Sequence, residues 1–377
     1  MNILFSITYF HPYVSGLSIC AKRIADGLIL AGHKVNVAAI RHDASLPENE
    51  QIGGLSIKRS NILFRVSKGF ISLSYVLDIF RAVRRADTIL CHLPQPESII
   101  PALLGRLMGK RVVVLYHCEL ELPPGVLNWT IQSLVDLSHL ITLFLAHRVV
   151  AYTMDYANSS RLLPLFKNKL TEIRPPIPEL EECTLLTEQI AKRIGDADIV
   201  IGVAARLARE KGIEYLIDSL PLLNNRFPGK IVKIVIAGPT DPVGEASYKM
   251  FIEKKVATYA GQIVFLGTIP SEHMASFYRS IDILAVPSVN RTEAFGLVQI
   301  EAMREGVPVV VSDLPGVRVP VRETGRGMVV PIRDSKAIAN AISLLVDSGI
   351  NNEIWNTAND QYVLAKAVSQ YEQVLAS

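Results

Sequence analysis

The chain has 377 residues, of which 49% are hydrophobic and 20% are charged. This length suits two α/β domains better than one core, and the hydrophobic content excludes a disordered chain. The formal net charge of +3 gives no support for nucleic-acid binding, and the scattered Cys20, Cys91, Cys118 and Cys183 match no zinc or disulfide pattern, which favours a reducing, cytoplasmic location.

The first half alternates short β-branched runs with helical patterns. A helix is expected over Leu17–Ala31, which Gly32 follows as a C-terminal cap. The start of the chain runs straight into a strand and lacks the basic region of a signal peptide, and no run of about 18 uncharged apolar residues predicts a membrane span. Strands are expected at Ile3–Thr8, Lys34–Ile40, Thr88–Leu93, Arg111–His117 and Arg148–Thr153.

Residues 175–179 read Pro-Pro-Ile-Pro-Glu and predict a linker, because adjacent prolines stop regular structure. We therefore expect an N-terminal domain over residues 1–178 and a C-terminal domain over 179–377. A last helix is expected at about 352–377, polar enough to lie on the surface, and it could pack back on the first domain.

The second half repeats the alternation of strands and helices. Its strands are expected at Ile199–Ala205, Lys233–Ala237, Ile263–Gly267, Ile283–Pro287, Val307–Ser312 and Met328–Pro331. This alternation predicts an α/β fold with two doubly wound, Rossmann-like domains. Ligands of such sheets bind at the carboxyl ends of the strands, and we expect them in a cleft between the two domains.

Two cations follow the first strand of the second half. Arg206 and Lys211 flank the turn after this strand, and Gly212 allows tight backbone geometry there. Guanidinium and ammonium groups in this position can converge on the oxygens of a diphosphate. The alternative is that both charges are solvated at the start of a helix.

The segment TEAFGLVQIEAMREGVPVVVS predicts a second anion site. Phe295 or Gly296 is expected to begin a helix that ends at Gly306. Glu293 precedes this helix and Glu301 lies two turns into it, so the two carboxylates can contact different parts of one extended ligand. Unpaired helix amides bind anions, and here they are expected to be those of Gly296, Leu297 and Val298.

Two further candidates lie in the first half. Gly16, in the loop after the first strand, would let the backbone approach a phosphate, although a simple turn glycine is the alternative. His117, at the end of a strand, is placed for polar contact or proton transfer, although a lone histidine is often structural.

These segments together resemble retaining glycosyltransferase family 4, and the likeness covers nearly the whole chain. The sequence departs from the family at Ser15, where a second glycine is frequent, and at Pro315 and Gly316, where relatives often carry Gly-Gly and an acidic residue. The elements that occur in the family's order are Ser15 with Gly16, AGHKV at 31–35, His117, AYTMDYANSS at 151–160, Arg206 with Lys211 and Gly212, VFLGTIP at 264–270, and the segment from Glu293 to Glu301 with GVPVV.

The resemblance implies the GT-B fold with a nucleotide-sugar donor held mainly by the C-terminal domain. It implies that Arg206 and Lys211 neutralise the pyrophosphate, that Glu293 binds hydroxyls of the donor sugar, and that Glu301 binds the ribose. His117 would contact the donor sugar near the reacting carbon. Further donor contacts are implied for Gly16 at the diphosphate, for Gly267, Thr268 and Ile269 near the base, and for Ala294, Phe295, Gly296, Leu297 and Val298 at sugar and phosphate.

The implied reaction moves a hexosyl unit from a UDP- or GDP-sugar to an acceptor hydroxyl, with retained anomeric configuration. In a front-face attack the leaving phosphate accepts the acceptor's proton, so no protein nucleophile is needed. The implied catalytic groups are His117, Glu293, Arg206 and Lys211. Neither a cofactor nor a metal is expected, because Arg206 and Lys211 would replace a divalent ion.

Two other functions are weighed against the transferase. A non-catalytic partner that keeps the fold and binds a nucleotide sugar is favoured by the departures at Ser15 and after the strand that ends at Ser312. A nicotinamide oxidoreductase would need G-x-G-x-x-G between a strand and a helix, and neither domain's opening turn has it.

The charge is unevenly shared along the chain. Residues 1–179 carry 19 Lys and Arg against 13 Asp and Glu, whereas the remainder carries 20 against 23. A glycan or lipid-linked acceptor is expected at the N-terminal domain, and the basic bias suggests peripheral contact with the inner membrane face. Ordinary solvated surface is the alternative.

Overall fold

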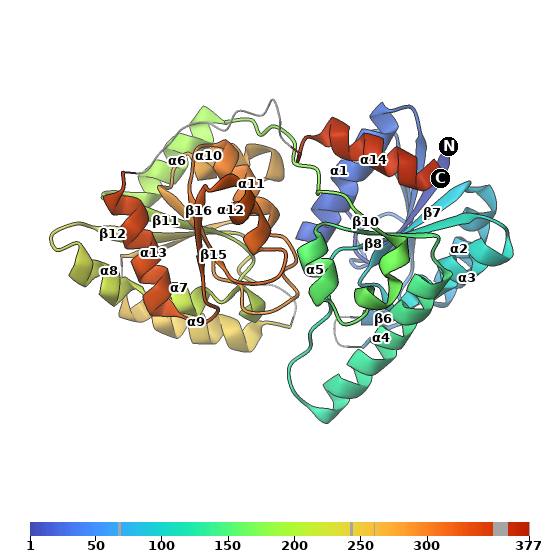
Figure 1. Cartoon of the computed structure of the whole chain (residues 1–377), viewed down its shortest axis with the longest axis horizontal. Helices are drawn as coiled ribbons and strands as arrows, with labels where there is room; N and C mark the ends of the chain where they lie inside the picture. Colours follow the sequence, from blue (N-terminus) through green and yellow to red (C-terminus); the bar gives the residue numbers. More distant parts are fainter. Residues whose placement is uncertain (67–68, 242–243, 260, 350–360, 377) are drawn as a thin grey trace. The chain divides into compact units, whose positions relative to one another are not determined.

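The computed structural model describes residues 1–66, 69–241, 244–259, 261–349 and 361–376. The chain forms two compact units: unit 1 consists of Met1–Pro178 with Asp360–Ser377, and unit 2 consists of Glu179–Asn359. Each unit is an α/β domain with a doubly wound sheet, as expected from the sequence (Figure 1). In the described part of the chain, no helix combines the length and apolarity that crossing a membrane requires.

Unit 1 is built on a sheet in the order β10-β9-β8-β7-β1-β2-β4-β3. Its central strand β7 is buried along its whole length, which explains why its sequence is almost continuously apolar. All pairs are parallel except β3 with β4. The bounds are β1 Asn2–Ser6, β2 Lys34–Ile40, β3 Asn49–Ile52, β4 Leu55–Ser60, β7 Thr88–Leu93, β8 Arg111–Tyr116, β9 Arg148–Ala151 and β10 Leu170–Glu172, with a separate hairpin of β5 Phe64–Val66 and β6 Gly69–Ile71.

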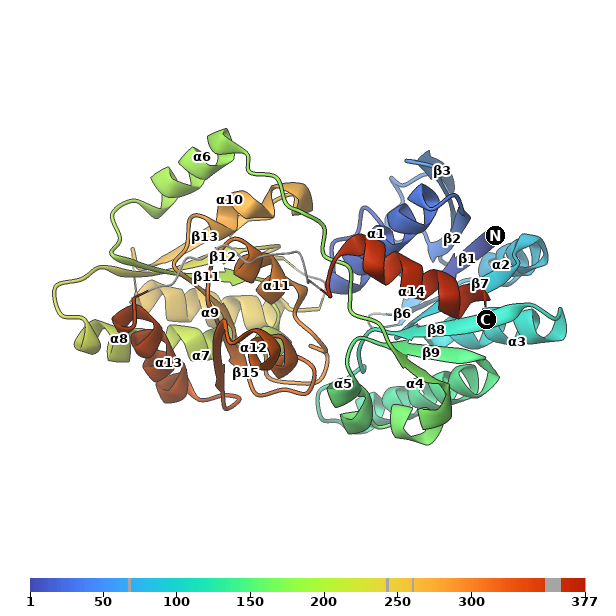
Figure 2. The same cartoon turned by 45° about the horizontal axis from the view of Figure 1, so that its top comes forward.

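Helices cover both faces of this sheet. The first helix begins where Ser15 caps it: the Ser15 hydroxyl accepts the amide of Ser18 at 3.2 Å, in a reciprocal capping box. One face carries α1 and α14, and the opposite face carries α2, α3 and α4 (Figures 1 and 2). The bounds are α1 Gly16–Leu30, α2 Leu73–Arg85, α3 Ile99–Leu107, α4 Val126–Leu145, α5 Met154–Ser159 and α14 Leu364–Ala376.

The C-terminal helix α14 packs on α1 and the sheet of unit 1. A Cβ added at Gly27 of α1 would lie 2.4 Å from Cγ2 of Val368, so glycine is what allows this close approach. The Thr88 hydroxyl donates to the carbonyl of Leu375 at 3.1 Å. The buried face of α14 consists of Ala367, Val368, Tyr371, Val374 and Leu375.

The last helix and the proline segment 175–179 both make contacts within unit 1. The last helix, α14, buries an apolar stripe and exposes polar residues such as Lys366 and Ser369 on its other side. Residues 350–360 of the expected span lie outside the described residues. The proline segment, for which the sequence predicts a linker, contains the division between the units at Pro178 and Glu179. Its Ile177 is buried, and the amide of Ile177 donates to the carbonyl of Tyr362 at 2.9 Å. The outgoing chain is therefore bonded to the returning chain.

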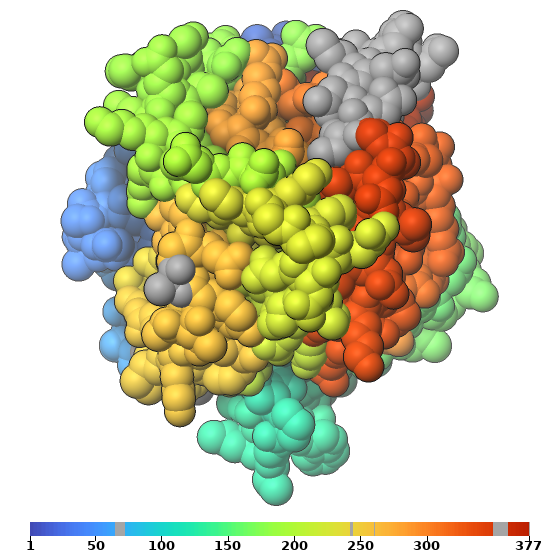
Figure 3. Space-filling view, turned by 90° about the vertical axis from the view of Figure 1, so that its left-hand side faces the viewer, coloured from blue at the N-terminus to red at the C-terminus, as the bar shows by residue number. Residues whose placement is uncertain are grey.

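Unit 2 is built on a parallel sheet in the order β13-β12-β11-β14-β15-β16. Its helices on one side bury a cluster that includes Leu216, Ile252 and Ile342, and Figure 3 looks onto the outer surface formed by α6, α8, α9 and α13. The bounds are β11 Ile199–Ala204, β12 Val232–Ala237, β13 Ile263–Gly267, β14 Ile283–Val286, β15 Val309–Ser312, β16 Gly327–Val330, α6 Thr184–Ile194, α7 Ile213–Ile217, α8 Leu220–Arg226, α9 Ala246–Thr258, α10 Met274–Tyr278, α11 Leu297–Arg304, α12 Arg318–Thr324 and α13 Ser335–Asp347.

The expected strands are all present, with ends shifted by at most two residues. The pairs β3–β4 and β5–β6 were not expected. The first of these lies at the edge of the sheet and joins its strands through Gly53 and Gly54, both with positive φ.

Candidate functional site

The candidate site lies in unit 2 at the carboxyl ends of β11 and β14. These two strands are neighbours in the sheet, and the connections from them run to opposite sides: β11 also pairs with β12, whereas β14 pairs with β15. Such a reversal of strand order leaves a crevice where the loops diverge, and ligands of doubly wound sheets bind there. Arg206 and Lys211 follow β11, and Glu293 follows β14.

The structure brings Lys211 and Glu293 into direct contact. Nζ of Lys211 lies 2.5 Å from Oε2 of Glu293, and the hydroxyl of Ser288 donates to the same oxygen at 3.2 Å. Both charged side chains are largely buried, with 23% and 14% of their surface exposed. Two residues that are 82 positions apart in the chain therefore form one polar group.

The surroundings of Glu293 keep it ionised. Burial alone would raise the pKa of this carboxyl, but the Lys211 ammonium, the Ser288 hydroxyl and the charge of Arg206 outweigh burial, so the pKa is lowered. A carboxylate that accepts two hydrogen bonds still has lone pairs free to accept hydroxyl groups of a ligand.

Arg206 lies at the start of the turn that follows β11, whereas Lys211 lies at its end. The guanidinium of Arg206 pairs with Glu210, four residues further along the loop, and both side chains are partly buried. The backbone carbonyl of Glu210 accepts the amide of Val289 at 2.9 Å, which ties the loop after β11 to the loop after β14. The two cations predicted for a diphosphate are thus each held by a carboxylate.

Gly212 allows the two loops to approach each other. Its φ is +60°, in the left-handed region. A Cβ at this position would lie 2.2 Å from the carbonyl oxygen of Pro287 and 2.6 Å from Cγ1 of Val289. Only glycine therefore fits directly after Lys211 while β11 and β14 keep their spacing.

The predicted helix after Glu293 is α11, and it begins at Leu297 rather than at Phe295 or Gly296. Gly296 is its N-terminal cap with a φ of +74°, which a side chain rarely adopts. Ala294 and Phe295 are buried, and the side-chain amide of Gln299 donates to the carbonyl of Phe295. The backbone amides left at the helix N-terminus are those of Gly296, Leu297 and Val298.

The two glutamates of this segment have separate environments. Glu301 lies on α11 and is 5% exposed, and its Oε2 accepts the hydroxyl of Tyr278 at 2.7 Å. Glu293 is bonded to Lys211 instead. Each carboxylate therefore keeps its own polar partner, and the role of Glu301 at a ribose stays a prediction.

The residues predicted to contact the nucleotide base follow β13, which lies two strands away from β11, at the same carboxyl edge of the sheet. Gly267 ends β13 with a φ of +78°, and its carbonyl accepts the amide of Gly238 at 2.8 Å. Thr268 and Ile269 follow it, and neither is buried. This arrangement leaves them accessible, and contact with a base stays a prediction.

The two candidates of unit 1 lie at the carboxyl edge of its sheet. Gly16 is the first residue of α1, directly after Ser15, and a Cβ added there would meet nothing within 4 Å. Its backbone does not require glycine, since its φ is not positive. Open space at a helix N-terminus is compatible with close approach of a phosphate.

His117 follows β8 directly instead of ending it, and it is buried. Its Nε2 lies 2.9 Å from Nδ1 of His92, and its Nδ1 lies 2.5 Å from the hydroxyl of Tyr152. Burial and the neighbouring His92 lower the pKa of His117 well below its ordinary value, so the ring is neutral at pH 7. It could contact a sugar only by giving up one of these bonds, and that role stays a prediction.

Several polar residues of the site were not singled out in the sequence. Glu210 lies four positions after Arg206, the spacing of helical ion pairs, but residues 206–208 are not helical, so this spacing does not explain the pair. Ser288, Tyr278 and Gln299 had no usable signal, since their polar contacts join loops and helices that only the fold brings together.

Two sequence families match the chain, and together they cover most of it. Residues 15–175 match the family described as Glycosyl transferase 4-like domain. Residues 187–361 match the family described as Glycosyl transferases group 1. Each match falls mainly within one unit of the fold.

Curated relatives agree with these families. An uncharacterized glycosyltransferase of Methanocaldococcus jannaschii is 28% identical over 370 residues, which cover 93% of this chain and 91% of the relative. A D-inositol 3-phosphate glycosyltransferase of Corynebacterium urealyticum is 33% identical over 150 residues, which cover 39% of this chain and only 34% of that relative.

The fold also matches solved structures. HepE of Anabaena, solved in complex with UDP, superposes with a TM-score of 0.78 at 18% identity, and the match covers all of both chains. At this identity the likeness concerns the fold alone, which is that of the GT-B proteins.

Proposed function

We propose that this chain, which has the GT-B fold, is a glycosyltransferase that transfers a hexosyl unit from a nucleotide-diphosphate sugar to an acceptor hydroxyl with retained anomeric configuration. One observation carries the proposal: Lys211 and Glu293 form a shielded ion pair, with Arg206 beside it, where the strand order reverses in unit 2. This group offers cations for a diphosphate and an ionised carboxylate for sugar hydroxyls.

The proposed chemistry is mainly electrostatic. As the bond from the anomeric carbon to the diphosphate breaks, negative charge grows on the leaving oxygen, and Arg206, Lys211 and the amides of α11 stabilise that charge. The acceptor hydroxyl attacks from the same face and passes its proton to the departing phosphate. Glu293 holds the donor sugar by its hydroxyls while this happens.

The site needs no metal in this scheme, because two cationic side chains take the place of a divalent ion. Their charges are partly balanced by Glu293 and Glu210 in the structure. We propose that a diphosphate draws the cations away from these carboxylates, which then become free to accept ligand hydroxyls. His117 is proposed to contact the sugar near its reacting carbon.

A UDP- or GDP-sugar is the proposed donor. Support for UDP comes from the fold neighbour HepE, whose solved complexes contain UDP and UDP-glucose. The proposed acceptor is a glycan or a lipid-linked molecule that binds unit 1, with peripheral contact between this unit and the inner membrane face.

A panel of UDP-, GDP-, ADP- and TDP-sugars tests the proposal. The purified chain is incubated with each donor, with and without a cell extract as acceptor, and release of nucleoside diphosphate is followed. We expect release from one donor, increased by the extract, and a loss of about 100-fold or more in Lys211→Ala. Wild-type rates in Lys211→Ala would refute the donor site. The exposed Lys192 of α6 provides the matched control, Lys192→Ala.

A non-catalytic subunit that binds a nucleotide sugar is the second candidate. It is favoured by His117, whose two ring nitrogens already have partners inside unit 1. Tight donor binding without transfer to any acceptor would support this candidate over the transferase.

A further inference from the structure

The outward face of α4 is largely apolar from its first residue to Phe144, with Thr130 and Ser133 as its exposed polar residues. Val126 is 85% exposed and Trp129 is 71% exposed, at the start of the helix, and Phe144 near its end is 72% exposed. The exposed large apolar side chains of α4 are Val126, Leu127, Trp129, Leu134, Leu137 and Phe144. A helix on the surface of a globular domain ordinarily turns polar residues outward, so this face has the pattern of a buried one.

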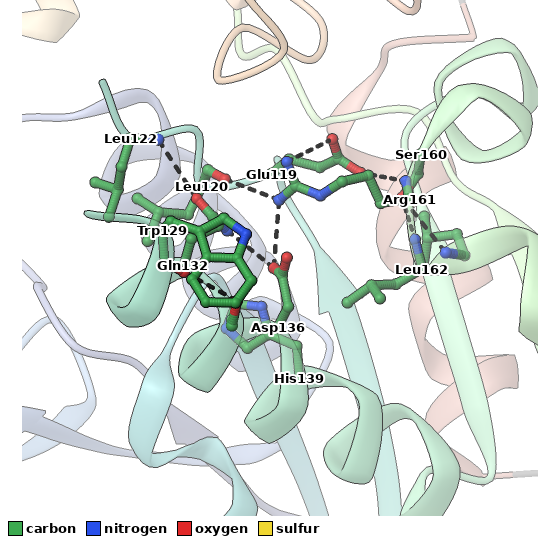
Figure 4. A network of polar contacts seen from close by, with 12 residues as sticks. Glu119, Leu120, Leu122, Trp129, Gln132, Asp136, His139, Ser160, Arg161 and Leu162 are labelled. Atoms are coloured by element: carbon green, nitrogen blue, oxygen red, sulfur yellow. Dashed lines mark hydrogen bonds and ion pairs between the residues drawn. The ribbon is translucent and has the colours of Figure 1, made fainter. Parts of the chain in front are cut away.

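The polar groups of α4 are bonded either within the helix or to neighbouring segments of unit 1. Arg161 donates to Asp136 at 3.3 Å and to the carbonyl of Leu120 at 3.0 Å (Figure 4). Gln132 also donates to Asp136, at 2.9 Å. These bonds hold the first half of α4 in place and occupy the carboxylate of Asp136, so the apolar face is a fixed feature of the fold.

The neighbouring helices extend this face. α4 packs beside α3, and α3 packs beside α2. Within the described residues, twelve exposed large apolar side chains lie on these three helices, against seven in all of unit 2. Those outside α4 are Leu73, Val76, Leu77 and Phe80 on α2, and Leu103 and Leu107 on α3. We call the outward side of α2, α3 and α4 the apolar helical face.

Cations gather at one end of the apolar helical face. The three helices run in the same direction relative to a parallel sheet, so their C-terminal ends meet at one edge. That edge carries Arg84 and Arg85 in the last turn of α2, Arg106 in the last turn of α3 and Lys110 after it, and Arg148 and Lys169 beyond α4. In the described residues, none of these six cations forms an ion pair with a carboxylate.

These cations are close to one another and to the exposed aromatic rings. The guanidinium of Arg106 lies 2.5 Å from Nε2 of His147, and burial, with the charges of Arg106, Arg111 and Lys169, lowers the pKa of this histidine. Nζ of Lys169 lies 5.6 Å above the ring of Phe144, and the guanidinium of Arg84 lies 5.9 Å above the ring of Phe80. Apolar and cationic groups thus form one continuous surface.

We propose that the apolar helical face docks on an anionic lipid bilayer. Its apolar side chains would enter the boundary between headgroups and acyl chains, Trp129 would lie at the headgroup level, and the row of cations would contact lipid phosphates. A second copy of the chain is a poorer occupant, because a two-fold pairing of this face would bring two rows of uncompensated cations into one interface.

Docking would place unit 1 where a lipid-linked acceptor is found. The inference rests on the proposed function only in assuming a lipid-linked acceptor. Binding to a bilayer itself requires no donor and no turnover. Nucleoside diphosphate release in the absence of vesicles reports on the transferase, and sedimentation with vesicles reports on the surface. A failure of the transferase proposal can therefore be distinguished from a failure of the docking proposal.

Sedimentation of the full chain with vesicles tests the proposal. We expect the chain to sediment with vesicles of phosphatidylglycerol and phosphatidylcholine, and to stay in solution with phosphatidylcholine alone. Leu134→Glu with Leu137→Glu should weaken binding about tenfold or more, since it places charges in the apolar contact. Arg84→Gln with Arg85→Gln should weaken it about 25-fold, at about fivefold per charge.

Leu30→Glu is the matched control, because Leu30 is exposed on α1 at the opposite face of the same sheet. It should bind vesicles like wild type, and thermal melts should show that all variants are folded. Equal binding to neutral and anionic vesicles, absence of vesicle binding, or unchanged binding of the Leu134/Leu137 variant would each overturn the proposal. Self-association in solution that the same variant abolishes, without vesicle binding, would assign the face to a second copy.

Discussion

At the scale of single residues, the central feature is that the cations and carboxylates of the site hold one another. Lys211 and Glu293 are both largely buried, and each compensates the charge of the other. Removing one partner of such a pair leaves an unpaired charge in a site of low polarity, which costs more than the pair itself contributes. Their individual effects should therefore depend strongly on each other.

A double-mutant cycle tests this dependence. Lys211→Ala and Glu293→Gln should each lower kcat/KM by about 100-fold, and the double variant should lose far less than the product of the two single losses. Steady-state kinetics with the donor identified from the panel provide the measurement. Losses that multiply would mean that the two residues act independently.

The sequence could identify these charged residues but not their contacts. Arg206, Lys211, Glu293 and Glu301 stand out because charges follow apolar strands in a fixed order. Ser288, which is 1% exposed and bonded to Glu293, looks in the sequence like any loop serine. The environment of His117, with both ring nitrogens bonded, likewise depends on residues 25 and 35 positions away.

At the scale of elements, the site depends on how closely the loops after β11 and β14 approach. Gly212→Ala would force a Cβ into the carbonyl of Pro287 and also strain a φ of +60°. We expect a loss of stability of about 2 kcal/mol or more and a shift of Lys211 that lowers turnover. Gly229→Ala is the control, because its φ is +82° but a Cβ there meets nothing within 4 Å. Thermal melts and donor turnover should separate the two variants.

The histidines around β7 and β8 make unit 1 sensitive to acid. Burial lowers the pKa of His92 to about 3 and the pKa of His139 to about 4, so both are neutral when folded but take up protons when unfolded below about pH 6.5. The contribution of these histidines to the free energy of unfolding is then fully present above pH 6.5. It is lost as the pH falls, by about 2 kcal/mol per histidine at pH 5.

Hydrogen exchange of peptides from β7 and β8, measured from pH 7.5 to pH 5 and corrected for intrinsic rates, checks this prediction. His139→Gln keeps an acceptor for the amide of Gln95, which His139 binds at 3.1 Å, but removes one titrating group. Its unfolding free energy should vary less steeply with pH. The same dependence of the unfolding free energy on pH in wild type and in His139→Gln would contradict the assignment of this dependence to the buried histidines.

Most of the elements could be predicted, because strands that are buried on both faces, such as β7, leave a strong apolar signal. The edge pair β3–β4 leaves a weak one, since seven of its ten residues are polar. Its Gly53 and Gly54 are the turn residues of a hairpin, so this pair could have been found. The sequence predicts the start of α11 one or two residues too early, because Gly296 is the N-terminal cap of this helix and not part of it.

At the scale of the whole molecule, the chain leaves unit 1 near residue 178 and returns to it near residue 360. A sequence pattern shows that a C-terminal helix exists but not which unit it packs on, because that depends on complementary surfaces such as Gly27 against Val368. Unit 1 is therefore completed only by the last residues of the chain.

The contribution of α14 can be measured at Tyr371, which is fully buried. Tyr371→Ala should destabilise unit 1 by about 3–5 kcal/mol through loss of the ring. Tyr371→Phe should stay within about 1 kcal/mol of wild type, because the hydroxyl has no hydrogen-bond partner among the described residues. Urea unfolding monitored by far-UV circular dichroism gives both values, and a mild effect of Tyr371→Ala would contradict the packing of α14.

Calorimetric titration with UDP, GDP, ADP and TDP tests the donor site most directly. We expect one of these diphosphates to bind the wild-type chain and Lys192→Ala equally well, and to bind Lys211→Ala at least about tenfold more weakly. Absence of binding by all four diphosphates, or binding to Lys211→Ala as tight as to wild type, would contradict a donor site at the ends of β11 and β14.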